Sequence, residues 1–279
     1  VESYVLASGA NTFTTGSVSQ AVDASAGGGI TTIITSGVLT GGAVYSGLNS
    51  NDVLSIANGT NIAAATIGAD FTSLTIASGA GVTMTAAQYL AFTSGIAASG
   101  SESITLTTAL TGAATLNANI ETFVFANAAN SVTSGAISQT LDASALSNGT
   151  VLTLAGTHAV TVTLVNGDLS AGGDSGNLTV NAGAGSNEIT TGSGNDLIAG
   201  AAGADTLDGG AGTNTLTAAN VLNTWNINAN NGGSVTGISG AFANIQNLVG
   251  GTDVDVFHFT EGIQHLVLGH ETAGAGLVE

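Results

Sequence analysis

The sequence contains no lysine, arginine, cysteine or proline among its 279 residues, and its 18 aspartate and glutamate residues give a formal net charge of −18. Without basic side chains the chain cannot neutralise a phosphate backbone or be drawn to an anionic membrane surface, which excludes nucleic-acid binding. Without cysteine, no disulfide holds the fold. No apolar run approaches the roughly 18 residues of a membrane span, so we expect no membrane insertion.

Because histidine is the only possible cation, acidic groups that approach each other must be relieved by water, by protonation or by a bound cation. Two carboxylates about 5 Å apart repel by roughly 3 kcal/mol at an effective dielectric constant near 20. The acids gather in two stretches, one containing Asp168, Asp174, Glu188, Asp196, Asp205 and Asp208 and the other Asp253, Asp255, Glu261, Glu271 and Glu279. A divalent cation is the natural remedy in both stretches.

Aromatic residues are only 4% of the chain, whereas hydrophobic residues reach 43% and alternate regularly with polar ones. Alternation with a period of two predicts short strands, and small residues suit a narrow core. The predicted strands are Thr31–Ile34, Ser73–Ile76, Val82–Met84, Ser103–Leu106, Glu121–Phe125, Val151–Leu154, Val160–Leu164 and Asn177–Val180. Helical periodicity is almost absent, with one short turn predicted in Thr85–Thr93 and another in Ala218–Leu222. The sequence therefore predicts an all-β protein with almost no helix.

A nine-residue repeat runs through residues 183–216 in four units that begin at Gly183, Gly192, Ala201 and Gly210. The third position is always glycine: Gly185, Gly194, Gly203 and Gly212. The fifth is always Asn or Asp: Asn187, Asp196, Asp205 and Asn214. The seventh is always aliphatic: Ile189, Ile198, Leu207 and Leu216. A short fixed period predicts stacked turns, which is a parallel β-solenoid.

The glycine and aspartate positions resemble the nonapeptide of the RTX (repeats-in-toxin) family, GGxGxDxUx. The resemblance implies a parallel β-roll that binds Ca²⁺ through carboxylate and glycine carbonyl oxygens, the hard ligands this ion prefers. It also implies two nonamers per coil, so that Asn187 stacks on Asp205 and Asp196 on Asn214. Each pair then has only one carboxylate, and we expect one or two ions bound more weakly than in an all-aspartate ladder. The alternative is that Asn and Asp serve only as turn formers.

Three further features extend this repeat. We include Asp208, near the end of the third unit, among the candidate ligands. The register also continues backward, with Gly176 at position three and Val180 at position seven, but Leu178 replaces the ligand, which predicts an ion-free solenoid leading into the roll. Residues 250–259 resemble the ending found in RTX-containing surface proteins, and we expect Asp253 and Asp255 to form a cation site with a coil beyond them.

A longer repeat encloses the short one. Residues 1–26 align without gaps with residues 120–145 at an offset of 119, and residues 243–249 resemble residues 118–124. This predicts three units, at 1–119, at 120–244 with nonamers 183–218, and at 245–279. Tandem arrays of large units suggest length rather than catalysis, and no nucleophile motif is present. We therefore expect a protein that is not an enzyme.

The sequence leaves two functions open. The first is a structural protein outside a bacterial cell or on its surface, such as a surface layer, sheath, filament or adhesin stalk, stiffened by calcium. The second is the calcium-binding repeat region of a type I-secreted RTX enzyme or toxin whose active domain lies outside this sequence. The long tandem repeat favours the first. Because the chain starts and stops within a repeat, we expect head-to-tail continuation with like units, and cell-surface polysaccharide is a candidate partner.

Overall fold

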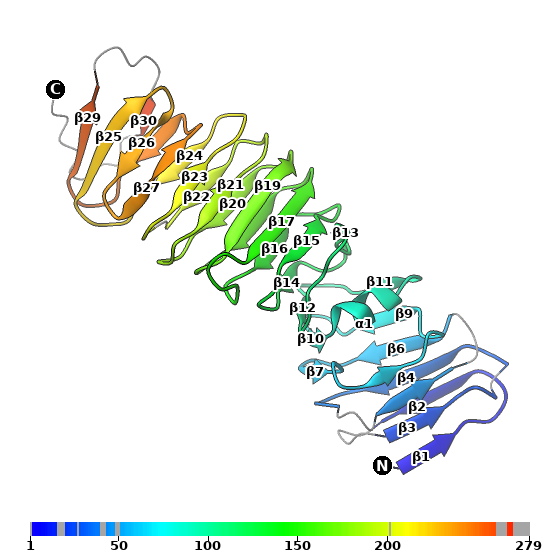
Figure 1. Ribbon diagram of the computed structural model, residues 1–279. Coiled ribbons are helices and arrows are strands. Elements are labelled where there is room, and N and C mark those ends of the chain that lie inside the picture. The colour runs from blue at the N-terminus through cyan, green and yellow to red at the C-terminus, as the bar shows by residue number, and fades with distance from the viewer. Residues whose placement is uncertain are drawn as a thin grey trace. The chain divides into compact units, whose positions relative to one another are not determined.

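The computed structural model describes residues 2–15, 20–26, 28–39, 43–47, 51–200, 202–260 and 267–269. These residues form a β-solenoid of stacked parallel strands with a single helix (Figure 1), which confirms the predicted fold class. The chain divides into two compact units. Unit 1 contains residues 1–110 and 117–126, and unit 2 contains residues 111–116 and 127–279.

Unit 1 is built from parallel strand ladders with side chains that alternate between core and surface. One sheet has the order β1 (Glu2–Val5), β3 (Gln20–Asp23), β5 (Val44–Ser46), β8 (Thr66–Ile67). A second has the order β11 (Gly95–Ala97), β9 (Ser73–Ile76), β6 (Val53–Ile56), β4 (Thr31–Thr35), β2 (Asn11–Thr14). A third ladder pairs β7 (Thr60–Asn61), β10 (Gly81–Met84), β12 (Ser103–Leu106) and β14 (Thr122–Val124) in that order.

The helix α1 spans Ala86–Ala91 and confirms the helical turn predicted within Thr85–Thr93. Thr85 and Gln88 form a capping box, in which each side chain accepts a hydrogen bond from the other residue's backbone N–H, at 3.1 and 2.9 Å. The Gln88 amide also donates to the carbonyls of Ile62 and Ala65, so this one residue both starts the helix and attaches it to the coil beneath.

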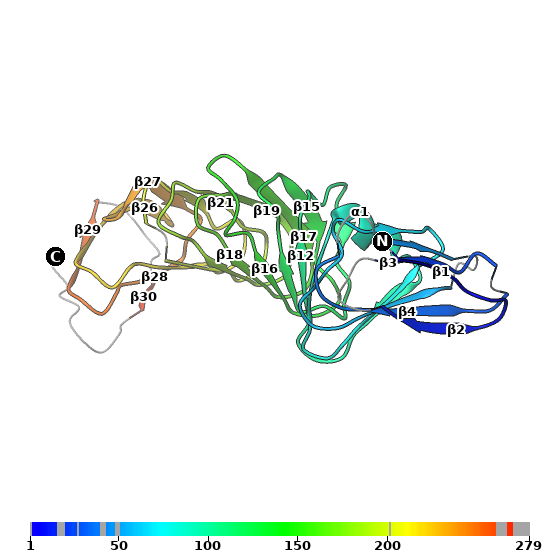
Figure 2. The ribbon, with the colours of Figure 1, turned by 90° about the horizontal axis from the view of Figure 1, so that it is seen from below.

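Unit 2 has two sheets, and strands that follow one another in sequence alternate between them up to β24 (Figure 2). The first has the order β13 (Ala114–Thr115), β15 (Asn130–Thr133), β17 (Val151–Gly156), β19 (Asp168–Asp174), β21 (Glu188–Thr190), β23 (Thr206–Asp208), β27 (Ile238–Ala243), β26 (Gly232–Val235), β25 (Asn223–Ala229), β29 (Asp255–Phe259). The second contains β16 (Gln139–Asp142), β18 (Val160–Thr163), β20 (Leu178–Asn181), β22 (Leu197–Ala199), β24 (Thr215–Thr217), β28 (Asn247–Val249) and β30 (Val267–Gly269).

The nonamers make one coil per pair, as the resemblance implied. Strand β21 pairs with β23 in a register that sets Ile189 beside Leu207, and β22 pairs with β24 so that Ile198 lies beside Leu216. These four aliphatic side chains are buried in the core between the sheets. The seventh position of each nonamer therefore supplies the hydrophobic contact that holds adjacent coils together.

The strand pairing is not parallel throughout. Strands β25, β26 and β27 form an antiparallel meander before β27 rejoins β23 in parallel. Its turns place Asn231 at φ 57° and Gly237 at φ 89°, backbone conformations that asparagine and glycine adopt most readily. The meander buries Trp225, which stacks on Phe257 with ring centroids 5.4 Å apart.

The helical turn predicted for Ala218–Leu222 is wrong. The side-chain amide of Asn223 donates to the carbonyls of Ala219 and Val221, at 3.0 and 2.7 Å. These hydrogen bonds occupy carbonyl oxygens that a helix would use for its own backbone, so the segment is a non-helical turn that enters β25.

The long sequence repeat coincides with equivalent strands. Strands β2 and β15 begin and end 119 residues apart, and so do β3 and β16. Strand β28 lies 125 residues after β14, at the weaker third repeat. The sequence division at residues 119 and 244 stays a prediction about the repeats, whereas the compact units divide between residues 110 and 127.

Candidate calcium site

The turns of the roll stack so closely that glycine is required for space. A Cβ atom on Gly194 would collide with the carbonyl oxygen of Gly176, and one on Gly212 with that of Gly194. Gly203 has the same relation to Gly185 and also has φ 117°. Glycine at the third position thus lets each turn lie directly against a backbone carbonyl of the preceding coil.

The first expected pair, Asn187 and Asp205, is stacked across adjacent coils. Asp205 Oδ1 accepts a hydrogen bond from the backbone N–H of Asn187 at 2.7 Å, and the Asn187 side-chain amide donates to the Gly167 carbonyl at 2.5 Å. Asn187 Oδ1 and Asp205 Oδ2 remain without a partner although both residues are buried. This pair therefore presents one amide oxygen and one carboxylate oxygen with no donor to satisfy them.

The second expected pair, Asp196 and Asn214, is also stacked but differs in chemistry. Asn214 Oδ1 accepts from the backbone N–H of Asp196 at 3.0 Å. The Asn214 amide nitrogen donates to three carbonyls, those of Gly209, Ala211 and Asn244. Both ends of the Asn214 amide are thus engaged. Asp196 Oδ1 accepts from the backbone N–H of Leu178 at 2.8 Å, one coil earlier, and its Oδ2 has no partner.

Asp174 is a further buried acid that the sequence analysis did not include among the ligands. Its Oδ1 accepts from the backbone N–H of Gly176 at 2.8 Å, and its Oδ2 has no partner. Continued backward, the nonamer register puts Asp174 at position one, which is glycine in three of the four units: Gly183, Gly192 and Gly210. The signal that could have identified it was an acid in a glycine position, in a unit set aside because its fifth residue is Leu178.

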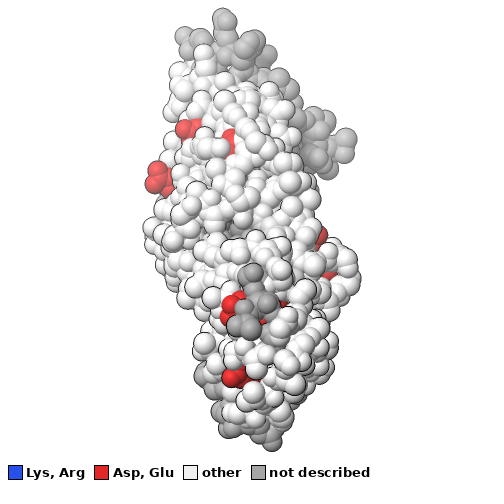
Figure 3. Space-filling model, turned by 90° about the vertical axis from the view of Figure 1, so that its right-hand side faces the viewer, with Lys and Arg blue, Asp and Glu red and all other residues white. Residues whose placement is uncertain are grey.

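Burial shapes the electrostatics of these acids. Desolvation raises the pKa of Asp205, and the nearby backbone N–H groups of Asn187 and Ala202 act in the opposite direction. Desolvation is also the main cause of the raised pKa of Asp174, and the charge of Asp196 raises it further, while His158 acts in the opposite direction. His158 itself is exposed. Figure 3 shows one face of the molecule, where acidic side chains form separate patches and no basic side chain is present.

These oxygens fit calcium. Four buried oxygens in the turns accept no hydrogen bond, and an unsatisfied buried polar group costs about 1–3 kcal/mol. The four are Oδ2 of Asp174, Asp196 and Asp205 and Oδ1 of Asn187. Within the described residues, no group of three or more His, Cys, Asp or Glu side chains comes together. A cation here would therefore be held by one or two carboxylates with amide and carbonyl oxygens, a set that suits Ca²⁺ and lacks the nitrogen and sulfur ligands of zinc.

The other predicted ligands lie apart from these turns. Asp208 is half-buried on β23, and its Oδ1 accepts from the backbone N–H of Gly210 at 2.9 Å and from the Asn244 amide at 2.7 Å. Asp255 is buried and accepts from the Asn223 amide at 2.7 Å, whereas Asp253 is exposed in the bend before β29. The later coil with which Asp253 and Asp255 were expected to form a site lies outside the described residues.

Residues 181–216 match the family described as the RTX calcium-binding nonapeptide repeat, in four copies. The repeat segment belongs to the RTX family. No curated protein and no solved structure matches the chain. RTX nonapeptides bind Ca²⁺, so this is a calcium-stiffened repeat protein with a β-solenoid fold. RTX repeats are typical of secreted bacterial proteins. Among the described residues, no helix has the length and apolar character of a membrane span.

Proposed function

We propose that this chain is part of a structural protein outside a bacterial cell, such as a surface layer, sheath, filament or adhesin stalk, and that it is not itself an enzyme. The observation that carries the proposal is the long repeat, because equivalent strands recur 119 residues apart in the same stacked fold. Repetition of whole coils extends a solenoid along its axis, and a longer solenoid gives reach and stiffness rather than a reaction centre.

The equivalence of β1 and β14 supports self-association or continuation with like units. Strand β1 lies at one end of its sheet and pairs with β3. Its equivalent in the second repeat, β14, pairs on the preceding side with β12, so that this edge is covered by an earlier coil. Val5, at the end of β1, is 75% exposed. A like unit that docked head to tail would cover the edge of β1 as β12 covers β14.

Calcium binding fits export to this location. Ions bound only by the folded roll stabilise it by mass action, and extracellular binding modules have dissociation constants of about 10⁻⁴–10⁻³ M. A roll with weak sites would therefore fold and stiffen where calcium is abundant. Coupling of folding to calcium would keep the chain flexible before secretion and rigid after it.

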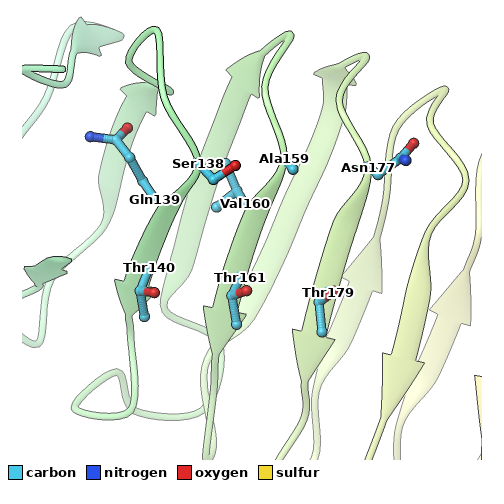
Figure 4. Close-up of a pocket in the computed structure, with 8 residues that line it drawn as sticks. All are labelled: Ser138, Gln139, Thr140, Ala159, Val160, Thr161, Asn177 and Thr179. Atoms are coloured by element: carbon cyan, nitrogen blue, oxygen red, sulfur yellow. The ribbon is translucent and has the colours of Figure 1, made fainter. Parts of the chain in front are cut away.

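A polar groove on unit 2 supports polysaccharide as a partner (Figure 4). The in-register residues Thr140, Thr161 and Thr179 form a row across β16, β18 and β20. Ser138 and Asn177 add further uncharged polar groups to the same groove. Hydroxyl and amide groups without charge can exchange hydrogen bonds with a neutral glycan, and strands about 4.8 Å apart repeat them regularly.

Electron microscopy and sedimentation of the purified chain with calcium and with EGTA test the structural role. We expect ordered filaments or sheets with calcium, and a Val5→Lys variant should assemble less because the added charge blocks the β1 edge. Val165→Lys, which changes a valine of unit 2 that is 40% exposed, is the matched control and should assemble normally. Monomers in calcium that hydrolyse a substrate would instead support the repeat region of a secreted enzyme or toxin.

A further inference from the structure

The turn Asp174–Leu178 receives carboxyl groups from two consecutive coils. Asp174 bonds to the N–H of Gly176 within the turn, and Asp196 reaches down from the next coil to the N–H of Leu178 at its end. The Ser193 N–H also donates to the Asp174 carbonyl at 3.0 Å, which stacks the following turn on this one. The two carboxyl groups are therefore held by hydrogen bonds to two backbone N–H groups of one turn, those of Gly176 and Leu178.

Each carboxyl group uses only one of its oxygens. Oδ2 of Asp174 and Oδ2 of Asp196 have no partner, and the two residues are only 2% and 1% exposed. Water therefore has little access to either oxygen. The chain contains no lysine or arginine that could neutralise the pair. Two buried carboxylates in one turn repel each other, and a shared divalent cation satisfies both orphaned oxygens at once.

Asn214 shows how the fold satisfies such a turn without an ion. At the fifth position of the last nonamer, its amide N–H groups donate to the carbonyls of Gly209, Ala211 and Asn244. A carboxylate has no proton to donate, so an aspartate in this position cannot satisfy the turn carbonyls. A cation can bind both these carbonyls and the carboxylate. Asparagine thus takes the place of an ion in its own turn. Asp196 has no such donor, so its Oδ2 needs a cation, which Asp174 on the preceding coil can share.

We propose that Asp174 and Asp196 together bind one Ca²⁺ in the Asp174–Leu178 turn, in front of the nonamers that the RTX family match covers. This site rests on the calcium binding that underlies the proposed function but adds a ligand, Asp174, from a coil whose fifth position is Leu178. A second ion belongs to the Asn187–Asp205 pair, and the Asp196–Asn214 pair takes none. The first ion would join the last coil before the nonamers to the first nonamer coil.

Isothermal titration calorimetry of the full chain with calcium alone, combined with metal counting after dialysis, tests this site. Asp174→Asn should lose about one bound ion per chain, because one carboxylate with amide and carbonyl oxygens holds calcium more weakly than two. Asp196→Asn should lose the same ion, and the double variant should lose no more than either single variant. Asp205→Asn should lose the other ion.

Asp142→Asn is the matched control. Asp142 makes the same local hydrogen bond, from the backbone N–H two residues later, but is half-buried on an outer position of β16. Its variant should keep every ion. Asp174→Gly is a second test variant. Glycine occupies the same position of the repeat at Gly192 and Gly210, so the variant turn should still fold. It should also lose one ion, with the Trp225 fluorescence of the folded protein retained.

Retention of the wild-type ion count by Asp174→Asn and Asp174→Gly would overturn the proposed site and leave the calcium-stiffened roll intact. That result would mean that Asp174 carries a proton or that Asp196 holds its ion with carbonyl oxygens alone. Failure of the proposed structural role is a different result, because it would appear as calcium-loaded chains that do not assemble, whatever ion count the Asp174 variants show.

Discussion

Several glycines of unit 1 serve a different purpose from the glycines of the nonamer roll. In unit 1, Gly59 and Gly79 have φ 72° and 70°, and a Cβ atom on either would meet nothing within 4 Å. These glycines supply a left-handed turn in open space. In the roll, Gly194 and Gly212 lie directly against carbonyl oxygens of the preceding coil. There, glycine is needed because the backbones of adjacent turns touch.

This difference changes what fills the turns. Unit 1 caps neighbouring coils with acidic side chains, as where Asp52 accepts from the N–H of Thr31 at 2.8 Å and Glu102 from that of Gly79 at 2.9 Å. Glu102 is 1% exposed and keeps one oxygen unsatisfied, and it is the one acid with such an oxygen among the described residues of unit 1. In the roll, orphaned oxygens recur in successive buried turns. We therefore expect the roll to depend on a cation more strongly than unit 1.

Calcium removal should have the largest effect, and it should separate the two units. The chain carries its own reporters, since the three tyrosines (Tyr4, Tyr45 and Tyr89) lie in unit 1 and the single tryptophan, Trp225, in unit 2. Chelation with EGTA should lower the melting temperature seen by Trp225 fluorescence. Calcium at 100 times its dissociation constant contributes about 2.7 kcal/mol per site, which the chelated roll loses.

The near-ultraviolet circular dichroism of the tyrosines is the internal control and should change little on chelation. Equal shifts in both signals would mean that the two units unfold together or that unit 1 also binds calcium. If chelation shifted neither signal, the Asn and Asp residues of the nonamers would serve only as turn formers. Magnesium added in place of calcium should restore less stability, because it demands a smaller octahedral set of ligands than carbonyls and carboxylates of this turn provide.

Gly194→Ala should have the next largest effect. The added methyl group meets the Gly176 carbonyl, which belongs to the backbone and cannot rotate away, so the coils must separate. Overpacking of this kind costs about 1–3 kcal/mol. Gly172→Ala is the control, since a Cβ atom at Gly172 meets nothing within 4 Å, and its stability should change little. Urea unfolding followed by Trp225 measures both variants, and equal stability of the two would contradict close stacking as the reason for glycine.

Much of the roll could be predicted because its register repeats. Three fixed columns set the strand positions, and the resemblance to RTX repeats, which implies two nonamers per coil, set the stacking of Asn187 on Asp205. The same logic failed at Asp174, because the unit that contains it has Leu178 at the ligand position and was therefore taken to bind no ion. Only the three-dimensional structure shows that Asp174 and Asp196, from two coils, accept hydrogen bonds from the same turn.

The antiparallel meander at residues 223–243 also lay beyond the sequence analysis. Its turn residues Asn231 and Gly237 are ordinary turn signals, but they do not specify whether the next strand continues the coil or reverses direction. Trp225 decides this through packing, because the reversed strands enclose its ring against Phe242 and Phe257. Such long-range contacts have no short sequence period. The helix prediction for Ala218–Leu222 failed for a related reason, because the hydrogen bonds of the Asn223 side-chain amide outweigh a weak helical pattern.

Acidification should have the smallest effect, and its sign should differ between the regions. Burial raises the pKa of Asp174 and Asp205, so the ion-free folded roll binds protons more tightly than the unfolded chain and gains stability as the pH falls toward their ordinary value of 3.8. In unit 1, hydrogen bonds from Ser25 lower the pKa of Asp23, so the stability it contributes is lost as the pH falls below that value.

Calcium should reverse the response of the roll, because the ion requires ionised carboxylates and protons compete with it. The measurement is the Trp225 melting temperature between pH 7 and pH 4, with EGTA and with calcium. We expect a rise on acidification in EGTA and a fall in calcium. Lowered net charge stabilises the whole chain in both cases, so Asp205→Asn serves to isolate the local effect and should flatten both slopes. Slopes of the same sign with and without calcium would show that the buried acids of the roll do not hold the ion.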